Sequence, residues 1–490
     1  MNNLFFYDLI FLVLFSLAVT IFLYIKRKNL KREGLMYLYR TKFGMEFIDY
    51  IGGKHKKKLK ALSYVVIASG YLLMITMVYL LGQLLYFYIK SPDIIRAIKV
   101  PPLMPLIPYL PSLFKIDFLP PFYFTYWIIS IAIVAIFHEF SHGIFMKFNN
   151  IKIKSTGFGF LGPFLAAFVE QDEKQMVKKS KFAQITVLSA GTFANLVLSI
   201  LFFLLLAVFF VLAYAPSGAM FNTYTFGPVV ISGITMVDGV SINNASSGTI
   251  LTLINQNNLT NNLILGTQNN TLELTKITTK DKIYFITIDN LKEQLKLNNS
   301  FIIAYNDFPA INAGLRGSII KINEDKVSSY IELGRVMKNY NPGETVKIKT
   351  RDGNEILEYN LVLAEESNKT SSRAVLGIGI IEQSTRLISK ISDFFNFFKQ
   401  PATDYQPRFN SDLVIFIYNL IWWIAIINIS VALANMLPMG IFDGGRMFML
   451  TMVAITGSKR AGEAAFRIAT WIISTIFILL MLSWAVAIFF

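Results

Sequence analysis

The sequence contains no cysteine, few histidines and few charged residues. Without cysteine the chain can form no disulfide bond, hold no metal through a thiolate and use no cysteine nucleophile. Charged residues make up 16% of the 490 residues, whereas a soluble globular protein carries about 25%. This deficit argues against a soluble cytosolic enzyme. Any histidine-dependent chemistry must use His55, His138 or His142, because the sequence has only three histidines.

Long uncharged blocks stand where the charges are missing. A helix needs roughly 20 apolar residues to cross the hydrocarbon core of a bilayer, and six blocks reach that length. They occupy residues 4–25, 61–89, 121–146, 182–213, 413–437 and 464–490. The first block has no basic segment before it and is long enough to span, so we interpret it as a helix and not as a cleaved signal peptide. The sequence therefore predicts an α-helical polytopic membrane protein with about six transmembrane helices.

Basic residues predict how these helices are oriented. Residues 26–60 contain twelve Lys and Arg, residues 147–181 contain seven, and the Pro-rich segment 91–120 contains only three. Since short cytoplasmic loops are enriched in Lys and Arg, we place 26–60 and 147–181 in the cytoplasm and both termini outside. The net charge of +15 is concentrated in these loops, so we expect contact with the lipid bilayer of the cell membrane and no nucleic-acid partner.

Residues 214–412 differ in composition from the apolar blocks. Asparagine and threonine rise, alternating runs such as 346–350 predict half-exposed strands, and Arg351-Asp352-Gly353 predicts a hairpin turn. We expect a soluble insert, mostly β, on the extracytosolic side. Residues 237–242 resemble residues 322–327, 85 residues later, and each segment precedes a helix-like stretch. This weak repeat predicts two small tandem domains.

The third apolar block contains the motif His138-Glu139-Phe140-Ser141-His142. Residues i and i+4 share one face of a helix, so both imidazoles can bind one metal ion. Glu139 adjoins them and can act as general base on a water molecule. An ionisable residue inside a membrane span costs at least about 2.5 kcal/mol on insertion scales, which favours a functional role over helix packing.

The third ligand can be sought by elimination. Catalytic zinc usually has three protein ligands and one open position. His55 lies in the Lys-rich loop, Asp8 lies near the outer end of the first block, and Glu139 is assigned as base. Asp443 follows the fifth block at a depth similar to that of the two histidines. The stretch 435–446 contains one proline and three glycines, and non-helical backbone at membrane depth is tolerated only inside protein or beside a wet cavity.

These motifs resemble the site-2 proteases, a family of intramembrane zinc metalloproteases. The resemblance covers residues 121–213 and 413–460. It implies one Zn²⁺ per chain, with His138 and His142 as zinc ligands, Glu139 as the catalytic residue and Asp443 as the third ligand. The family's Leu-Asp-Gly reads Phe-Asp-Gly here, and its second proline is replaced by glycine at position 440. The resemblance implies regulated intramembrane proteolysis, with a transmembrane protein that another protease has already shortened as the substrate.

Two softer matches extend the resemblance. Residues 157–160, Gly-Phe-Gly-Phe, resemble the family's membrane-dipping β-hairpin, on which an extended substrate would pair. Residues 191–195 resemble its G-x-x-x-N motif. Asn195 and Asn435 would then bind the substrate backbone or the oxyanion, or simply form hydrogen bonds between helices.

The insert resembles a PDZ domain at residues 309–353. The resemblance implies either peptide capture by strand addition or a size filter over the active site. The resulting organisation comprises an N-terminal part with two helices, a catalytic half with the His motif, a first PDZ-like region, a second PDZ-like domain with a linker, and a second catalytic half. These parts span residues 1–120, 121–213, 214–300, 301–412 and 413–490.

Three other functions remain open from the sequence. A zinc transporter or sensor would use the same ligands without needing a poised base. A PDZ-bearing membrane scaffold would hold a structural metal, and changing Glu139 would then have no effect. A different membrane zinc protease, with glutamate as third ligand, would not require Asp443.

Overall fold

The computed structural model describes most of the chain. The described residues are 3–34, 36–90, 101–102, 104–114, 116, 119–161, 164–256, 263–267, 270–297, 299–368, 371–381 and 396–489. They form two compact units, one made of residues 1–209 with 412–490 and the other of residues 210–411.

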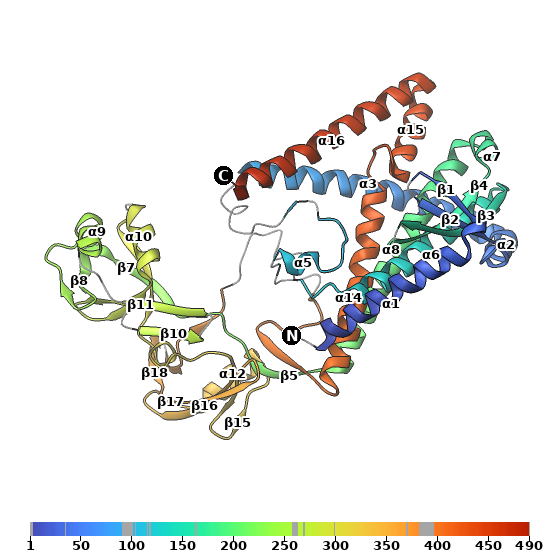
Figure 1. The fold of residues 1–490 in the computed structure, drawn as a ribbon. Helices are drawn as coiled ribbons and strands as arrows, with labels where there is room; N and C mark the ends of the chain where they lie inside the picture. The colour runs from blue at the N-terminus through green and yellow to red at the C-terminus, as the bar shows by residue number, and fades with distance from the viewer. Residues whose placement is uncertain are drawn as a thin grey trace. The chain divides into compact units, whose positions relative to one another are not determined.

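Six helices of the described chain are long and apolar enough to cross a membrane, as the sequence predicts. Their bounds are α1 Asn3–Ile25, α3 Lys56–Lys90, α6 Phe124–Phe148, α8 Lys181–Ala213, α14 Ser411–Asn435 and α16 Lys459–Phe489 (Figure 1). Helix α6 starts at Phe124, three residues after Pro121. Shorter helices join them: α2 Met45–Lys54, α5 Leu110–Leu113, α7 Glu173–Lys178 and α15 Asp443–Thr456, with a 3₁₀ turn at Arg27–Asn29.

The N-terminus of α6 is capped by a residue of another helix. Asp8 of α1 is buried, and its carboxylate accepts hydrogen bonds from the backbone N–H groups of Phe124 and Thr125 and from the hydroxyls of Thr125 and Tyr109. These N–H groups have no partner within a helix, and a negative charge is favourable at this end of the helix dipole. Asp8 therefore ties α1 to the start of α6.

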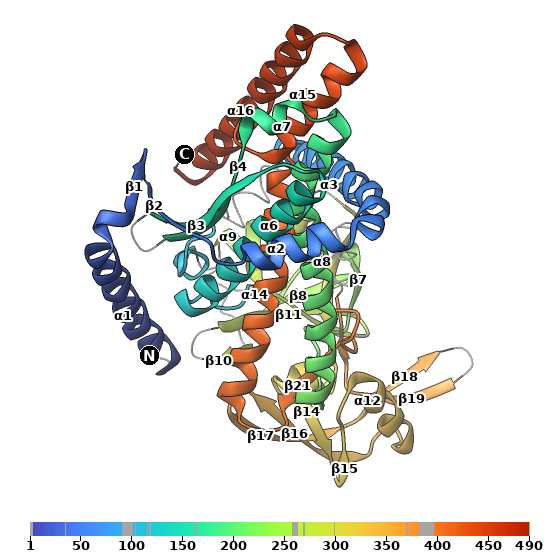
Figure 2. The same ribbon diagram turned by 90° about the vertical axis from the view of Figure 1, so that its right-hand side faces the viewer.

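A four-stranded antiparallel sheet lies beside α6 in the first unit (Figure 2). Its order is β1 (Leu30–Glu33), β2 (Met36–Thr41), β3 (Ile153–Leu161) and β4 (Phe164–Gln171). The strands β3 and β4 form the hairpin that the Gly-Phe-Gly-Phe motif predicts. The strands β1 and β2 come from the stretch that the sequence predicts only as a basic loop. Strand β1 pairs with β2, and β2 pairs with β3 in register Leu38↔Gly159.

The chain between α14 and α15 is not helical. Helix α14 ends at Asn435, and α15 begins at Asp443. The turn packs closely on α15, since a Cβ at Gly444 would lie 2.4 Å from the Met436 backbone and a Cβ at Gly445 would lie 2.2 Å from the Met439 carbonyl oxygen. The glycines therefore allow the first turn of α15, and with it Asp443, to sit against the end of α14.

The second unit consists of sheets and short helices, in agreement with a mostly β insert. One sheet has the order β7-β13-β12-β11-β8-β9, with β10 paired to β11, and another has the order β17-β16-β14-β5-β21, with β15 paired to β14. Two small pairs, β18-β19 and β20-β6, complete the described strands. The predicted turn at 351–353 joins β16 to β17, and Gly353 has a φ of +59°. The bounds are β5 Tyr214–Ala219, β6 Thr223–Tyr224, β7 Phe226–Val230, β8 Ile234–Val237, β9 Val240–Ser241, α9 Ser247–Gln256, β10 Leu263–Thr267, β11 Asn270–Thr279, β12 Ile283–Ile286, α10 Ile288–Lys296, β13 Phe301–Asn306, α11 Pro309–Asn312, β14 Ser318–Ile322, β15 Asp325–Lys326, α12 Tyr330–Val336, β16 Thr345–Asp352, β17 Glu355–Val362, β18 Ala364–Asn368, β19 Ser371–Val375, β20 Ile378–Gly379 and β21 Thr403–Pro407, with 3₁₀ turns at Ile231–Gly233 and Met337–Asn339.

This unit has two main hydrophobic cores, and they are nested along the chain. One core runs from Val229 to Ala304, and the other combines Ala219 with residues from Ala310 to Leu376. The second core therefore takes residues from both sides of the first along the chain. The two repeated segments form equivalent hairpins, β8-β9 and β14-β15, with Asp238 and Asn323 both at positive φ.

Candidate metal and catalytic site

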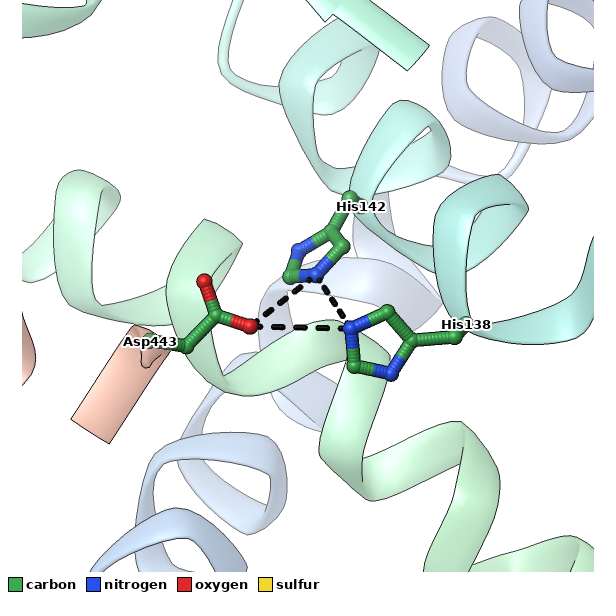
Figure 3. A group of neighbouring side chains, drawn as sticks. All are labelled: His138, His142 and Asp443. Atoms are coloured by element: carbon green, nitrogen blue, oxygen red, sulfur yellow. Dashed lines mark hydrogen bonds and ion pairs between the residues drawn. The ribbon is translucent and has the colours of Figure 1, made fainter. Parts of the chain in front are cut away.

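His138, His142 and Asp443 lie together in the first unit (Figure 3). Their closest atoms form a triangle: His138 Nε2 and His142 Nε2 are 3.0 Å apart, and Asp443 Oδ2 lies 3.5 Å and 3.4 Å from them. Donors around a tetrahedral zinc with bonds of about 2.0–2.1 Å stand about 3.3 Å apart. Both histidines are buried and Asp443 is half-buried. The donor set and its spacing therefore fit a zinc ion.

The far nitrogen of each imidazole also has a partner. His142 Nδ1 donates to the backbone oxygen of Val187 at 2.6 Å, which leaves Nε2 unprotonated for a metal. His138 Nδ1 lies 3.0 Å from the side-chain amide of Asn195. Metal-binding histidines usually donate their other N–H in this way, which fixes the tautomer and the orientation of the ring.

The amide of Asn195 has a preferred orientation if His138 binds a metal. Asn195 is completely buried, and its Oδ1 has no hydrogen-bond partner within the described part of the chain. With Nε2 on a metal, Nδ1 of His138 carries the proton and needs an acceptor. Turning the amide by 180° places Oδ1 on that N–H and satisfies both groups.

Gly191 provides the space in which the imidazoles meet. A Cβ at this position would lie 2.4 Å from His142 Nε2 and 2.6 Å from His138 Nε2. These are the two atoms that would bind the metal. Gly191 therefore allows α8 to approach the two histidines without covering them.

Glu139 is held by the sheet. Its Oε2 accepts a hydrogen bond of 2.9 Å from the backbone N–H of Val169 on β4. The side chain is half-buried and lines the same cleft as His138 and Asp443. One carboxylate oxygen is thus fixed, and the residue is placed to receive a proton beside the three ligands.

The cleft has a volume of about 560 Å³. Its lining combines the four motif residues with one face of the sheet, the strand β4 and parts of α7, α8 and α15: Glu33, Met36, Leu38, Arg40, His138, Glu139, His142, Met146, Lys154, Gly159, Ala166, Ala167, Phe168, Val169, Glu170, Gln171, Glu173, Val187, Leu188, Asp443 and Arg446. Such a concave site, with a few converging polar groups, is typical of a substrate-binding site.

An ion-pair cluster closes one end of the sheet face. Arg40 Nε lies 2.9 Å from Glu170 Oε2 and a second nitrogen lies 2.9 Å from Glu33, while the Ser155 hydroxyl donates to Glu170 at 2.8 Å. The hydrogen bond from Arg40 holds the pKa of Glu170 below its usual range, and that from Ser155 lowers it further. These contacts join β2, β3 and β4 across the sheet.

The structure also places the other residues considered from the sequence. Asn435 is half-buried at the end of α14 and does not line the described cleft. His55 follows the end of α2 and contacts the ring of Tyr50. Asp8 caps the far end of α6, fourteen residues before His138 or about 21 Å along the helix axis, which excludes it as a ligand.

Three contacts were not found from the sequence. The carbonyl of Val187 and the N–H of Val169 are backbone groups, so no pattern of side chains in the sequence predicts these contacts. The role of Gly191 has a signal, because Gly191 and Asn195 are four residues apart and share a helix face with Val187. That face is the one turned to the two histidines.

Comparison of the sequence with models of known protein families finds a match to one family. The model of Peptidase family M50, the site-2 protease family that the motifs resemble, matches residues 126–482. This match spans both halves of the site and the insert between them. No curated protein matches the chain. Because this match covers more than half of the sequence and the described chain has six helices that could cross a membrane, the chain belongs to Peptidase family M50, a family of membrane proteases.

Proposed function

We propose that the chain is a zinc-dependent endopeptidase that cuts membrane-protein substrates within or near a transmembrane helix. The observation that supports this most strongly is the meeting of His138, His142 and Asp443 beside Glu139. The ligands come from helices about 300 residues apart in sequence and yet converge in one cleft. The cell membrane is the proposed location, with the PDZ-like insert outside the cytoplasm.

His138, His142 and Asp443 would hold the metal, and the fourth position would remain open to substrate and water. When bound, zinc supplies a Lewis acid that polarises the scissile carbonyl and lowers the pKa of a water molecule toward neutrality. Val187 and Asn195 keep the two imidazoles in the tautomer that binds through Nε2. Gly191 keeps the space in front of them free.

Glu139 would carry the proton. Its carboxylate takes a proton from the attacking water and passes it to the nitrogen of the leaving amine. The hydrogen bond from Val169 fixes Oε2 of Glu139, so the other carboxylate oxygen is already directed to the reacting atoms. The side chain then loses no conformational freedom when the reaction begins.

A transmembrane substrate would have to unwind before cleavage, because a helix keeps its carbonyls in internal hydrogen bonds. Pairing of the unwound segment with the hairpin remains a prediction. Strand β4 is the edge of the sheet on this side, and it lies against α6, with the Val169 N–H already donated to Glu139. A substrate strand that pairs there would therefore have to separate β4 from α6.

The other functions that the sequence leaves open predict different outcomes for Glu139. A zinc transporter, a sensor or a scaffold with a structural metal has no need for a base, and a change of Glu139 would leave its function intact. The fixed contact with Val169 supports a positioned base instead. A protease with a glutamate ligand would not place Asp443 beside the histidines.

The substitution Glu139→Gln tests this proposal. The purified variant should retain one zinc per chain and lose at least about 100-fold in cleavage of a hydrophobic helical peptide, which is the lower range for loss of general-base catalysis. Glu463→Gln on α16 removes a carboxylate that pairs with Lys459 outside the cleft, and it serves as control. Unchanged cleavage by Glu139→Gln would refute the proposed role.

A further inference from the structure

One face of the four-stranded sheet forms an apolar wall of the cleft. Leu38, Gly159 and Ala166 are register partners on β2, β3 and β4, so these three positions lie on the same face of the sheet. Met36 lies two residues before Leu38 on β2 and shares that face. All four residues line the cleft together with His138 and Asp443. We call these four residues the apolar wall.

The side chains of Met36 and Leu38 cover Gly159 in the apolar wall. A Cβ there would lie 2.6 Å from Met36 Cε, 3.3 Å from Leu38 Cδ2 and 3.7 Å from the Ala166 Cβ. The wall thus consists of a residue without a side chain, an alanine and two flexible aliphatic side chains that border them. Such a surface accepts an apolar side chain, and methionine adapts to its shape.

The opposite face of the sheet is already covered. Tyr39 and Phe160 on that face contact Phe22 of α1 at ring distances of 5.3 Å and 5.6 Å. Leu165 packs against the helix cluster that contains Phe122 and Trp127. The apolar wall therefore lies on the less covered face and lines the cleft, which Ala167 and Val169 of the alternate face of β4 also line.

The wall changes from apolar to charged along the strands. On β2, Arg40 lies two residues after Leu38. On β4, Glu170 lies four residues after Ala166, which is about 13 Å in an extended strand. The charged end carries both signs and therefore favours polar residues without favouring one charge: Glu170, Glu173, Arg40, Lys154 and Arg446. Glu33 is the register partner of Met36 on β1 and is joined to this end by its ion pair with Arg40.

We propose that the apolar wall is the subsite that selects the substrate's side chain next to the scissile bond. It takes one aliphatic or aromatic side chain, and the charged end takes polar residues within about four positions of it. The preferred substrate is therefore the end of a transmembrane segment, where apolar residues give way to polar ones. This inference rests on the proposed proteolytic function.

Two substitutions test the subsite in opposite directions. Ala166→Leu fills the wall and Leu38→Ala enlarges it, while Leu165→Ala removes the same side chain from the covered face as a control. The probe is a 25-residue peptide of Ala and Leu with lysine ends, in detergent with zinc. Mass spectrometry locates the wild-type cut, and each neighbouring position is then replaced by Ala, Leu or Trp.

The ratio of kcat/KM between substrates is the readout. One methylene in a pocket changes selectivity about 10- to 200-fold. At the substrate position that the wall binds, Ala166→Leu should therefore shift the ratio by about tenfold or more toward the Ala peptide. Leu38→Ala should shift the ratio at the same position toward the Trp peptide. Leu165→Ala should leave every ratio unchanged. If the wild type cuts the peptides and both wall variants keep its ratios, the proposed subsite is overturned while the proposed proteolytic function stands. A zinc-loaded wild type that cuts no peptide would overturn the proposed function, and the subsite with it.

Cross-linking gives a test that needs no turnover. A photoreactive phenylalanine derivative replaces Leu38 or, as control, Leu165 in the Glu139→Gln background. The Leu38 position should capture the peptide at one or two neighbouring residues, and the Leu165 position should not. Equal capture at both positions would overturn the assignment, and this holds even if one of the cleavage variants fails to fold.

Discussion

At the scale of single residues, the site depends on one face of α8. Val187, Gly191 and Asn195 follow each other at intervals of four residues, and each meets the histidine pair. The backbone oxygen of Val187 accepts a hydrogen bond from His142, and the side chain of Asn195 contacts His138. Gly191 leaves space for both imidazoles. The sequence suggests a substrate-binding role for Asn195. Its complete burial and its contact with His138 lead us to propose a positioning role instead.

Asn195→Ala should separate these two roles. Loss of a group that orients a metal ligand lowers metal affinity about 10- to 100-fold, so we expect weaker zinc binding in a competition with a chelator. A variant with unchanged zinc affinity and reduced kcat would instead support the contact with substrate or oxyanion that the motif suggests.

Gly191→Ala should disrupt the metal site directly. The added methyl carbon would lie 2.4 Å and 2.6 Å from the two Nε2 atoms and displace the imidazoles, so the variant should lose bound zinc while its helices remain folded. Gly82→Ala is the matched control, because Gly82 lies in the long helix α3 and a Cβ there meets no atom within 4 Å. Equal zinc content in both variants would contradict the role assigned to Gly191. Circular dichroism checks the fold.

At the scale of secondary-structure elements, the strand β4 and the helix α6 act as a pair. Strand β4 fixes the carboxylate of Glu139 and also forms part of the cleft wall. A Cβ at Gly157 would lie 2.3 Å from the Tyr39 carbonyl oxygen, so a glycine is needed there. The sequence predicts the hairpin through the resemblance of residues 157–160 to the family's β-hairpin. It did not predict the partner strands β1 and β2, because their Lys and Arg residues also fit an exposed loop.

Restraint of β4 against α6 should stop cleavage if a substrate strand enters between them. The chain has no cysteine, so Ile136→Cys with Ala167→Cys can be joined by a reducible bis-maleimide, and both positions line one small gap beside Glu139. Activity should fall on cross-linking and return on reduction of the linker. Full activity of the cross-linked protein would show that substrate does not pass between β4 and α6.

At the scale of the whole molecule, hydropathy was sufficient to find the six long helices, because apolar length is a property of the sequence alone. The joining of His138 with Asp443 could be argued from depth and elimination, and the structure supports it. The nesting of the two cores in the insert could not be predicted, since the strand β5 contributes to a core whose other residues begin near Ala310, after the first core is complete.

The predicted orientation can be checked with single cysteines. Lys57→Cys lies in the basic stretch assigned to the cytoplasm, and Asn244→Cys lies on an exposed turn of the insert. In intact cells a membrane-impermeant maleimide should label the second variant only, and permeabilisation should expose the first. The cysteine-free parent supplies the background. If only Lys57→Cys is labelled in intact cells, the topology is the reverse of the predicted one.

The most direct test of the account is the zinc content of the purified chain in detergent. We predict about one zinc per wild-type chain and a clear loss in Asp443→Ala, because the triangle of His138, His142 and Asp443 loses one of its three donors. Asp412→Ala, at the other end of α14, should keep its zinc. Full zinc in Asp443→Ala would contradict the account, because the two halves of the chain would then not share one metal site.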